Sequence, residues 1–188
     1  LILCVDLGTD VLPAIALGVD KADPDIMESP PRNPKERILN KKFIIHFVYL
    51  GIFIGSIVTF YFYLTLNSYG GETSYLKAST SAFVLLVFIQ MWNAINSRSF
   101  SHSIFKIGFF KNPHLIGAIA ISIIVVFAMV QIPFLQKALG TTGLNTLEWL
   151  MVIGASSLVF VLEELRKILF KGKFTGYVGM IALGDVTL

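Results

Sequence analysis

Residues 43–66 read FIIHFVYLGIFIGSIVTFYFYLTL, a run of 24 residues in which only His46 could carry a formal charge. An α-helix rises about 1.5 Å per residue, so a run of this length crosses the hydrocarbon core of a bilayer, which is roughly 30 Å thick. Of the 188 residues, 55% are hydrophobic and only 14% are charged, against about 25% charged in an ordinary soluble domain. The sequence therefore predicts an integral membrane protein.

Four further segments have the length and apolar character of membrane helices: residues 1–19, 78–95, 115–134 and 147–170. Asn112 and Pro113 precede the third of these, and this pair favours the start of a helix. We therefore predict an all-α, polytopic membrane bundle of five transmembrane helices. The chain begins directly in an apolar run, without an initiating Met or a basic leader, so we expect it to be part of a longer protein.

The basic residues are distributed unevenly over the two sides of this bundle. If the helices alternate in direction, two of the 15 Lys and Arg residues, Lys77 and Lys137, lie on one side. The other side carries thirteen: Lys21, Arg32, Lys35, Arg37, Lys41, Lys42, Arg98, Lys106, Lys111, Arg166, Lys167, Lys171 and Lys173. Cytoplasmic loops carry an excess of basic residues, so this side is predicted to be cytoplasmic. The charges lie between apolar runs, which indicates a lipid bilayer as partner and no nucleic acid.

The first apolar segment contains CVDLGTDVLP at residues 4–13. A carboxylate at the centre of a membrane helix costs about 2.5–3.5 kcal/mol on insertion scales, so two of them indicate a function or a partner. At about 100° per residue, Asp6, Thr9 and Asp10 share one face of a helix. Pro13 has no N–H for the carbonyl of Thr9, and that oxygen is freed for another partner.

Two carboxylates, a hydroxyl and a freed carbonyl are hard oxygen donors, which Na⁺, K⁺, Ca²⁺ and Mg²⁺ prefer. This pattern indicates a cation site. The structural alternative is that the two acids pair with basic side chains of other helices or cap a helix end. Gln90 and Asn93 lie three residues apart in the segment 78–95. Their amide oxygens suit a cation shell, and interhelical hydrogen bonding is the alternative.

Two further patterns indicate packing and surface charge. Gly51 and Gly55 are separated by three residues, a spacing that lets helices approach closely. Glu163 and Glu164 lie beside two basic residues near the end of the last segment. We expect a surface ion-pair cluster there instead of a second cation site.

The stretch CVDLGTDVLPAIALGVDKADPDIMESPPRNPKERI resembles the sixth transmembrane helix and following cytoplasmic loop of type II P-type cation ATPases, which include calcium pumps and sodium/potassium pumps. The likeness continues through WNAINSRSF, NPHLIGAI and LEWLMVIGASSLVFVLEELRK, so it covers residues 1–171. It implies that residues 1–171 form the C-terminal transmembrane domain, with the last five of ten helices. Residues 172–188 are a tail of unknown role.

In this family, the positions that match Asp6, Thr9 and Asp10 supply cation ligands. Reticulum-type calcium pumps have Asn where this chain has Asp6 and Glu where it has Gln90, whereas sodium/potassium pumps have Asp and Gln. Both residues favour a pump of the sodium/potassium type, while VLPAIALG and ESPPR look more like the calcium-pump version. We expect Na⁺ and K⁺ as the transported cations, with Ca²⁺ as the alternative. The expected metal ligands are Asp6, Thr9, Asp10, Gln90 and Asn93.

The family's phosphorylated Asp-Lys-Thr-Gly-Thr segment and its nucleotide pocket are absent from this chain. The resemblance implies that ATP and Mg²⁺ act in domains outside it, so that the rest of the pump is its partner. The expected location is the plasma membrane. Residues 20–42 resemble the loop that contacts the phosphorylation domain and are a candidate coupling element. A secondary transporter or channel subunit also uses acids at the membrane midplane and is an alternative function. A membrane scaffold protein, in which the two acids only pair with basic side chains, is a further alternative function.

Overall fold

The computed structural model describes residues 9–20, 41–71, 73–99 and 102–169, and all regular structure in these ranges is helical. The elements are α2 (Val11–Gly18), α3 (Lys41–Ser68), α4 (Thr73–Asn96), α5 (Ile104–Ile107), η2 (Phe109–Lys111), α6 (Pro113–Gln131), α7 (Pro133–Leu139) and α8 (Thr146–Leu169). Within the described ranges, four stretches are long and apolar enough to cross a membrane: Ile44–Ser68, Ser74–Asn96, Pro113–Gln131 and Thr146–Leu169. The predicted all-α, multi-pass membrane bundle is confirmed. Residues 1–8 of the predicted first segment lie outside the described ranges.

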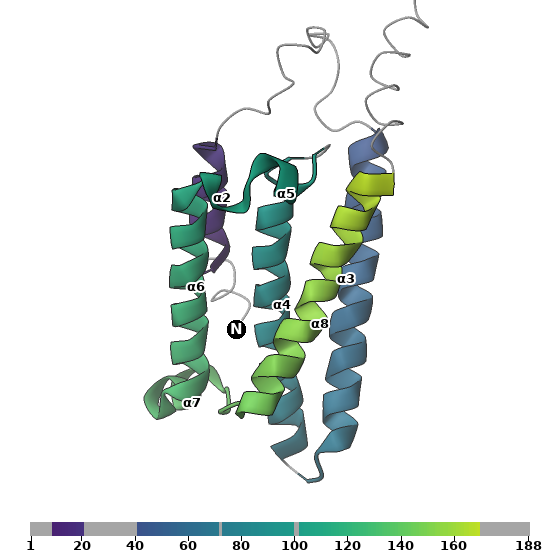
Figure 1. The fold of residues 1–188 in the computed structure, drawn as a ribbon. Helices are drawn as coiled ribbons and strands as arrows, with labels where there is room; N and C mark the ends of the chain where they lie inside the picture. The colour runs from purple at the N-terminus through teal and green to yellow at the C-terminus, as the bar shows by residue number, and fades with distance from the viewer. Residues whose placement is uncertain (1–8, 21–40, 72, 100–101, 170–188) are drawn as a thin grey trace, which may run out of the picture.

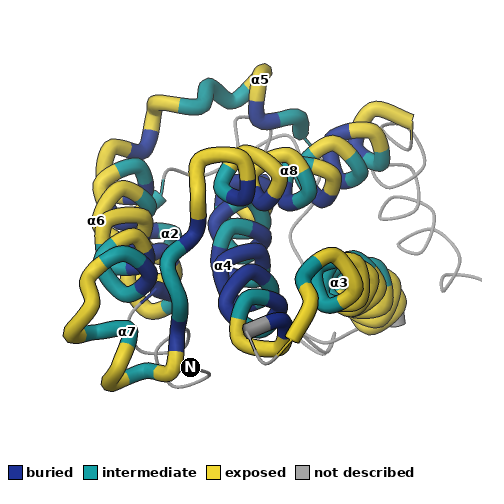
Figure 2. Tube along the Cα trace, turned by 90° about the horizontal axis from the view of Figure 1, so that it is seen from below, coloured by how far each residue is buried: buried dark blue, intermediate teal, exposed yellow. Residues whose placement is uncertain are grey.

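The long helices alternate in direction around α4 (Figure 1). In the view from below, α4 lies between α3, α8 and the pair formed by α2 and α6 (Figure 2). In the apolar stretch of α4 that could cross a membrane, 56% of the residues are buried inside the bundle, whereas 6% are buried in that of α3. α4 is therefore the central helix. The end of α2, α5, the start of α3 and the end of α8 share one end of the bundle, which we call the basic end (Figure 1). The turn between α3 and α4 and the helix α7 lie at the opposite end.

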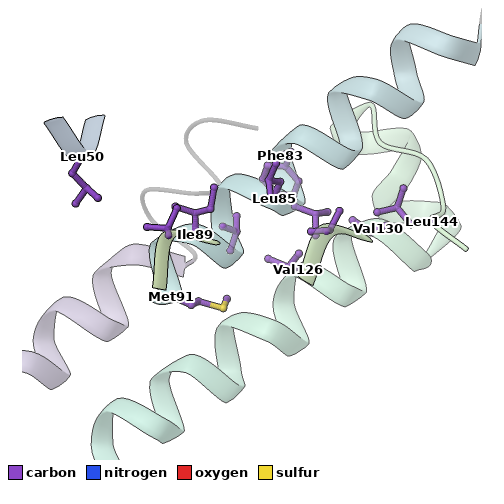
Figure 3. Close-up of a cluster of buried hydrophobic side chains, with 12 residues drawn as sticks. Leu50, Phe83, Leu85, Ile89, Met91, Val126, Val130 and Leu144 are labelled. Atoms are coloured by element: carbon purple, nitrogen blue, oxygen red, sulfur yellow. The ribbon is translucent and has the colours of Figure 1, made fainter. Parts of the chain in front are cut away.

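The core of the bundle forms where α4 meets α6 and α8. Its central side chains come from α4, between Phe83 and Met91, and pack against Val126 and Val130 of α6 (Figure 3). Val152 and Val159 of α8 and Leu50 of α3 also belong to this core. Because lipid tails are as apolar as these side chains, close packing and not the removal of water holds the helices together.

Among the described helices, two boundaries of the membrane-length segments differ from the predicted ones by more than two residues. The segment predicted to end at residue 134 stops at Gln131, because Pro133 has no N–H and holds Ile132 in an extended conformation (φ −85°, ψ 119°). A short helix, α7, begins at that proline. α4 begins at Thr73 instead of residue 78, so its first turns are polar. The predicted start of α6 is confirmed, since the Asn112 side chain caps the helix by accepting from the Leu115 N–H at 3.0 Å.

A buried carboxylate joins the helices at the end opposite the basic end. Lys77 Nζ donates to both oxygens of Glu148 at 2.9 Å, and the Tyr69 hydroxyl donates to the same carboxylate. Glu148 also accepts from the Asn145 N–H, while the Asn145 side chain accepts from the Glu148 N–H, which is a reciprocal helix cap. The hydrogen bond to Glu148 raises the pKa of the Tyr69 phenol above its ordinary value. These contacts tie the α3–α4 turn to the start of α8.

We expect Lys77→Gln to lower the free energy of unfolding by about 1–3 kcal/mol, because it leaves the buried Glu148 carboxylate without its cation. The measurement is the unfolding free energy of the purified, detergent-solubilised full-length protein. Lys137→Gln is the matched control, since Lys137 is an exposed basic residue at the same end of the bundle. Equal stability of the two variants would contradict the assignment.

The predicted ion pairs near the end of α8 are present, but their predicted position at the surface is wrong. Glu163, Glu164 and Lys167 are 2%, 5% and 3% exposed. Lys167 Nζ donates to Glu164 at 3.1 Å and to the carbonyl of Asn96, at the end of α4, at 2.9 Å. Glu164 also accepts from the Ser103 hydroxyl and, at 3.3 Å, from the Ile104 N–H. The end of α4 and the segment containing α5 therefore cover this face of α8.

The glycine spacing on α3 does not bring another described helix close. Gly51 and Gly55 are exposed, and a Cβ built on either would meet no atom within 4 Å. The predicted close approach is thus not made by the described residues of this chain. The glycine face of α3 points out of the bundle.

Candidate functional site

The turn before α2 departs from regular α-helix. Thr9 and Asp10 lie in a wider turn of the π type, and the buried Pro13 follows three residues after Asp10. Such turns accommodate a missing backbone hydrogen bond and frequently occur at functional sites. As predicted, Pro13 cannot pair with the Thr9 carbonyl. That oxygen instead accepts a hydrogen bond from Ser122 Oγ of α6 at 3.1 Å. This carbonyl, which was predicted to be one of the oxygen donors for a cation, therefore has a protein partner.

A cavity of about 180 Å³ lies between α2 and α4. Four of the five predicted ligands line it: Thr9 and Asp10 from the α2 side, and Gln90 and Asn93 from α4. Asp6, the fifth, lies outside the described residues. A water molecule occupies about 30 Å³ in the liquid, so the cavity has room for a cation and several waters.

The polar atoms around this cavity are oxygen donors of the kind that hard cations prefer. The Thr9 hydroxyl lies 3.5 Å from Asp10 Oδ1, and Thr9 is 2% exposed whereas Asp10 is partly exposed. Among the cavity-lining residues, Asp10 is the one with an ionisable side chain. In the part of the chain that the structure describes, no three His, Cys, Asp or Glu side chains form a metal-binding group. The described part of the site therefore combines one carboxylate with neutral hydroxyl and amide groups.

Sequence reasoning missed two residues of this region. Ser97 lines the cavity and lies four residues after Asn93, so helical spacing alone places both on one face of α4. The Ser122 hydroxyl reaches the site at the Thr9 backbone carbonyl, and no sequence pattern indicates that contact.

Further polar contacts hold the C-terminal part of α2. The Asn112 side-chain amide donates to the Ala16 carbonyl at 3.0 Å. The Arg98 guanidinium donates to Asp20 at 2.6 and 3.3 Å, and also to the carbonyls of Gly108 and Phe109. The helix that follows Thr9 and Asp10 is thus attached to α6 and to the connection between α4 and α6. This arrangement positions the α2 wall of the cavity opposite α4.

Comparisons with known proteins agree on one family. A family model described as "Cation transporting ATPase, C-terminus" matches residues 1–169. Calcium-transporting ATPase 1 of Bacillus cereus is 33% identical over 180 residues, which cover 89% of this chain and 20% of that protein. Calcium-transporting ATPase type 2C member 2 of Rattus norvegicus is 35% identical over 167 residues, 89% of this chain and 18% of that protein. Calcium-transporting ATPase 1 of Yarrowia lipolytica is 34% identical over 174 residues, 93% of this chain and 18% of that protein. The chain spans about a fifth of the length of these relatives.

Proposed function

Since this chain belongs to the cation-transporting ATPases and matches their C-terminal region, we propose that it is the cation-binding membrane portion of an ATP-driven calcium pump. The observation that carries the proposal is the cavity between α2 and α4, which is lined by oxygen-bearing side chains from both helices. The choice of calcium follows the names of the relatives, which are calcium-transporting ATPases. It replaces the sodium/potassium preference that Asp6 and Gln90 suggested.

Each of the five residues has a role in this proposal. Asp10 supplies a charged ligand, Thr9 a hydroxyl oxygen, and Gln90 and Asn93 amide oxygens. Asp6, outside the described residues, supplies the second carboxylate. Ca²⁺ takes six to eight oxygen ligands, so waters and helices of the remaining pump complete the shell.

The rest of the pump is the necessary partner of this chain. Phosphorylation from ATP with Mg²⁺ takes place in domains outside it, and cation binding must favour one conformational state of the pump over another for the two to be coupled. Residues 1–171 form the membrane domain in this proposal, and the basic end faces the cytoplasm of a cell whose plasma membrane holds the pump. The loop 20–42 is the proposed coupling element; only its ends fall within the described residues.

A cation panel tests the proposal on the full-length pump. We expect Ca²⁺ to stimulate formation of the phosphoenzyme from ATP, whereas Na⁺ and K⁺ leave it at the basal level. Stimulation by Na⁺ and not by Ca²⁺ would refute the choice of calcium and restore the sodium/potassium alternative. Transport without any phosphoenzyme would instead indicate a secondary transporter or channel.

A further inference from the structure

We propose that Ser122 is a positioning residue for the cation site and acts through the backbone of Thr9. Ser122 is fully buried on α6, and its Oγ donates to the Thr9 carbonyl at 3.1 Å. Thr9 is itself buried and lines the cavity with Asp10. The inference rests on the proposed function, because the quantity that this contact would set is the affinity of the site for its cation.

The sequence of α2 creates the need for this contact. In a regular helix the N–H of residue 13 would donate to the carbonyl of residue 9, but Pro13 has no N–H. A buried carbonyl without a partner is unfavourable, and more so inside a bilayer, where no water replaces the missing donor. Ser122 supplies that donor from a neighbouring helix.

The direction of the Ser122 hydrogen bond differs from that of two other helical serines, Ser56 and Ser156. Ser56 donates to the Ile52 carbonyl and Ser156 to the Ile153 carbonyl, each within its own helix. Such bonds are the usual way in which a serine hydroxyl is satisfied inside a helix. Ser122 donates across the helix interface, to the turn that carries two proposed ligands.

The geometry explains how this contact sets the position of those ligands. The Thr9 carbonyl points to α6, whereas the residues facing Thr9 and Asp10 across the cavity, Gln90 and Asn93, belong to α4. The attachments of α2 at Ala16 and Asp20 lie toward its other end. Ser122 therefore holds the turn that carries Thr9 and Asp10. Because the Thr9 carbonyl points to α6, the proposed ligands in the cavity are side-chain oxygens.

The first test measures cation activation of the phosphoenzyme in the full-length pump, with Ca²⁺, Na⁺ and K⁺ in parallel. We expect Ser122→Ala to raise the half-saturating Ca²⁺ concentration about three- to tenfold, with a near-normal level at saturating Ca²⁺. Ser122→Thr keeps the hydroxyl and should retain the wild-type value. Ser156→Ala is the matched control, because Ser156 is equally buried on α8 and its hydroxyl accepts from Trp92 of α4, so the variant also removes one interhelical hydrogen bond but none to the Thr9 turn.

The second test uses Pro13→Ala, which restores an N–H at the position that pairs with the Thr9 carbonyl. In that background Ser122→Ala should raise the half-saturating concentration less than it does alone, because the carbonyl has a second donor. A general packing role for Ser122 predicts equal effects in both backgrounds. If Ser122→Ala does not accumulate as a folded pump, the amount of folded Pro13→Ala/Ser122→Ala double variant is measured instead. Accumulation of the folded double variant supports the hydrogen bond between Ser122 and the Thr9 carbonyl as the role of Ser122, and failure to accumulate overturns it.

The outcomes separate this inference from the proposed function. In the first case, Ca²⁺ activates the wild-type pump, but the half-saturating Ca²⁺ concentration of Ser122→Ala is unchanged or lowered. This result overturns the role of Ser122 and leaves the calcium proposal standing. If Na⁺ activates the wild type instead of Ca²⁺, the calcium proposal fails, and the same shift is expected with Na⁺ as the probe. If no cation activates the wild type, both fail.

Discussion

Asp10→Asn in the full-length pump is expected to abolish Ca²⁺-stimulated phosphorylation. Asn keeps the shape of the side chain and one carbonyl oxygen but removes the negative charge, and Asp10 carries the one ionisable side chain among the residues that line the cavity. Loss of a charged partner in a largely buried site costs about 2–5 kcal/mol. The expected fall in Ca²⁺ affinity is therefore at least about 30-fold.

Binding of radioactive calcium and phosphoenzyme formation, both measured against Ca²⁺ concentration, check this result. Asp20→Asn is the matched control: it is the same substitution near the end of α2, but Asp20 pairs with Arg98 and does not line the cavity. We expect that variant to lose stability while it keeps saturable Ca²⁺ stimulation. Normal stimulation in Asp10→Asn would remove Asp10 from the site.

Lys167→Met is expected to produce the largest loss of stability, about 3–5 kcal/mol, which is the usual cost of breaking a buried ion pair. Lys167 is 3% exposed and donates to Glu164 and to the Asn96 carbonyl. Its removal leaves the buried Glu164 carboxylate without a cation at 3.1 Å. The same substitution removes the hydrogen bond that joins α8 to the Asn96 carbonyl at the end of α4.

The free energy of unfolding of the detergent-solubilised full-length protein measures this effect. Lys106→Met is the matched control, because Lys106 is exposed at the same end of the bundle. The double variant Lys167→Met/Glu164→Gln should lose less stability than the sum of the two single variants, since it leaves no unpaired charge. Additive losses would show that the two side chains act independently.

The membrane class and the helices were predictable from local sequence. An apolar run of 24 residues such as 43–66 can satisfy its backbone polar groups within one segment inside a bilayer by forming a helix. The end of α6 was also readable, because a proline, here Pro133, disfavours the helical conformation in the residue before it, Ile132. The predicted boundary at residue 134 followed the hydropathy and overlooked that proline.

Which faces of the helices are buried was much less predictable. In a soluble protein an apolar stripe indicates the core, but in a membrane the lipid-facing and the protein-facing sides are both apolar. Gly51 and Gly55 were therefore assigned to a helix contact and are exposed. Glu163 and Glu164 were assigned to the surface and are buried.

For the candidate site, the sequence by itself determined which groups α2 and α4 carry. Thr9 and Asp10 are consecutive residues, helical periodicity puts Gln90 beside Asn93, and Pro13 removes one backbone donor. Only the tertiary structure decided that both pairs line one cavity and that the freed carbonyl is bound by Ser122. The physical reason is that spacing along a helix determines its faces, whereas packing between helices far apart in the chain determines what each face meets.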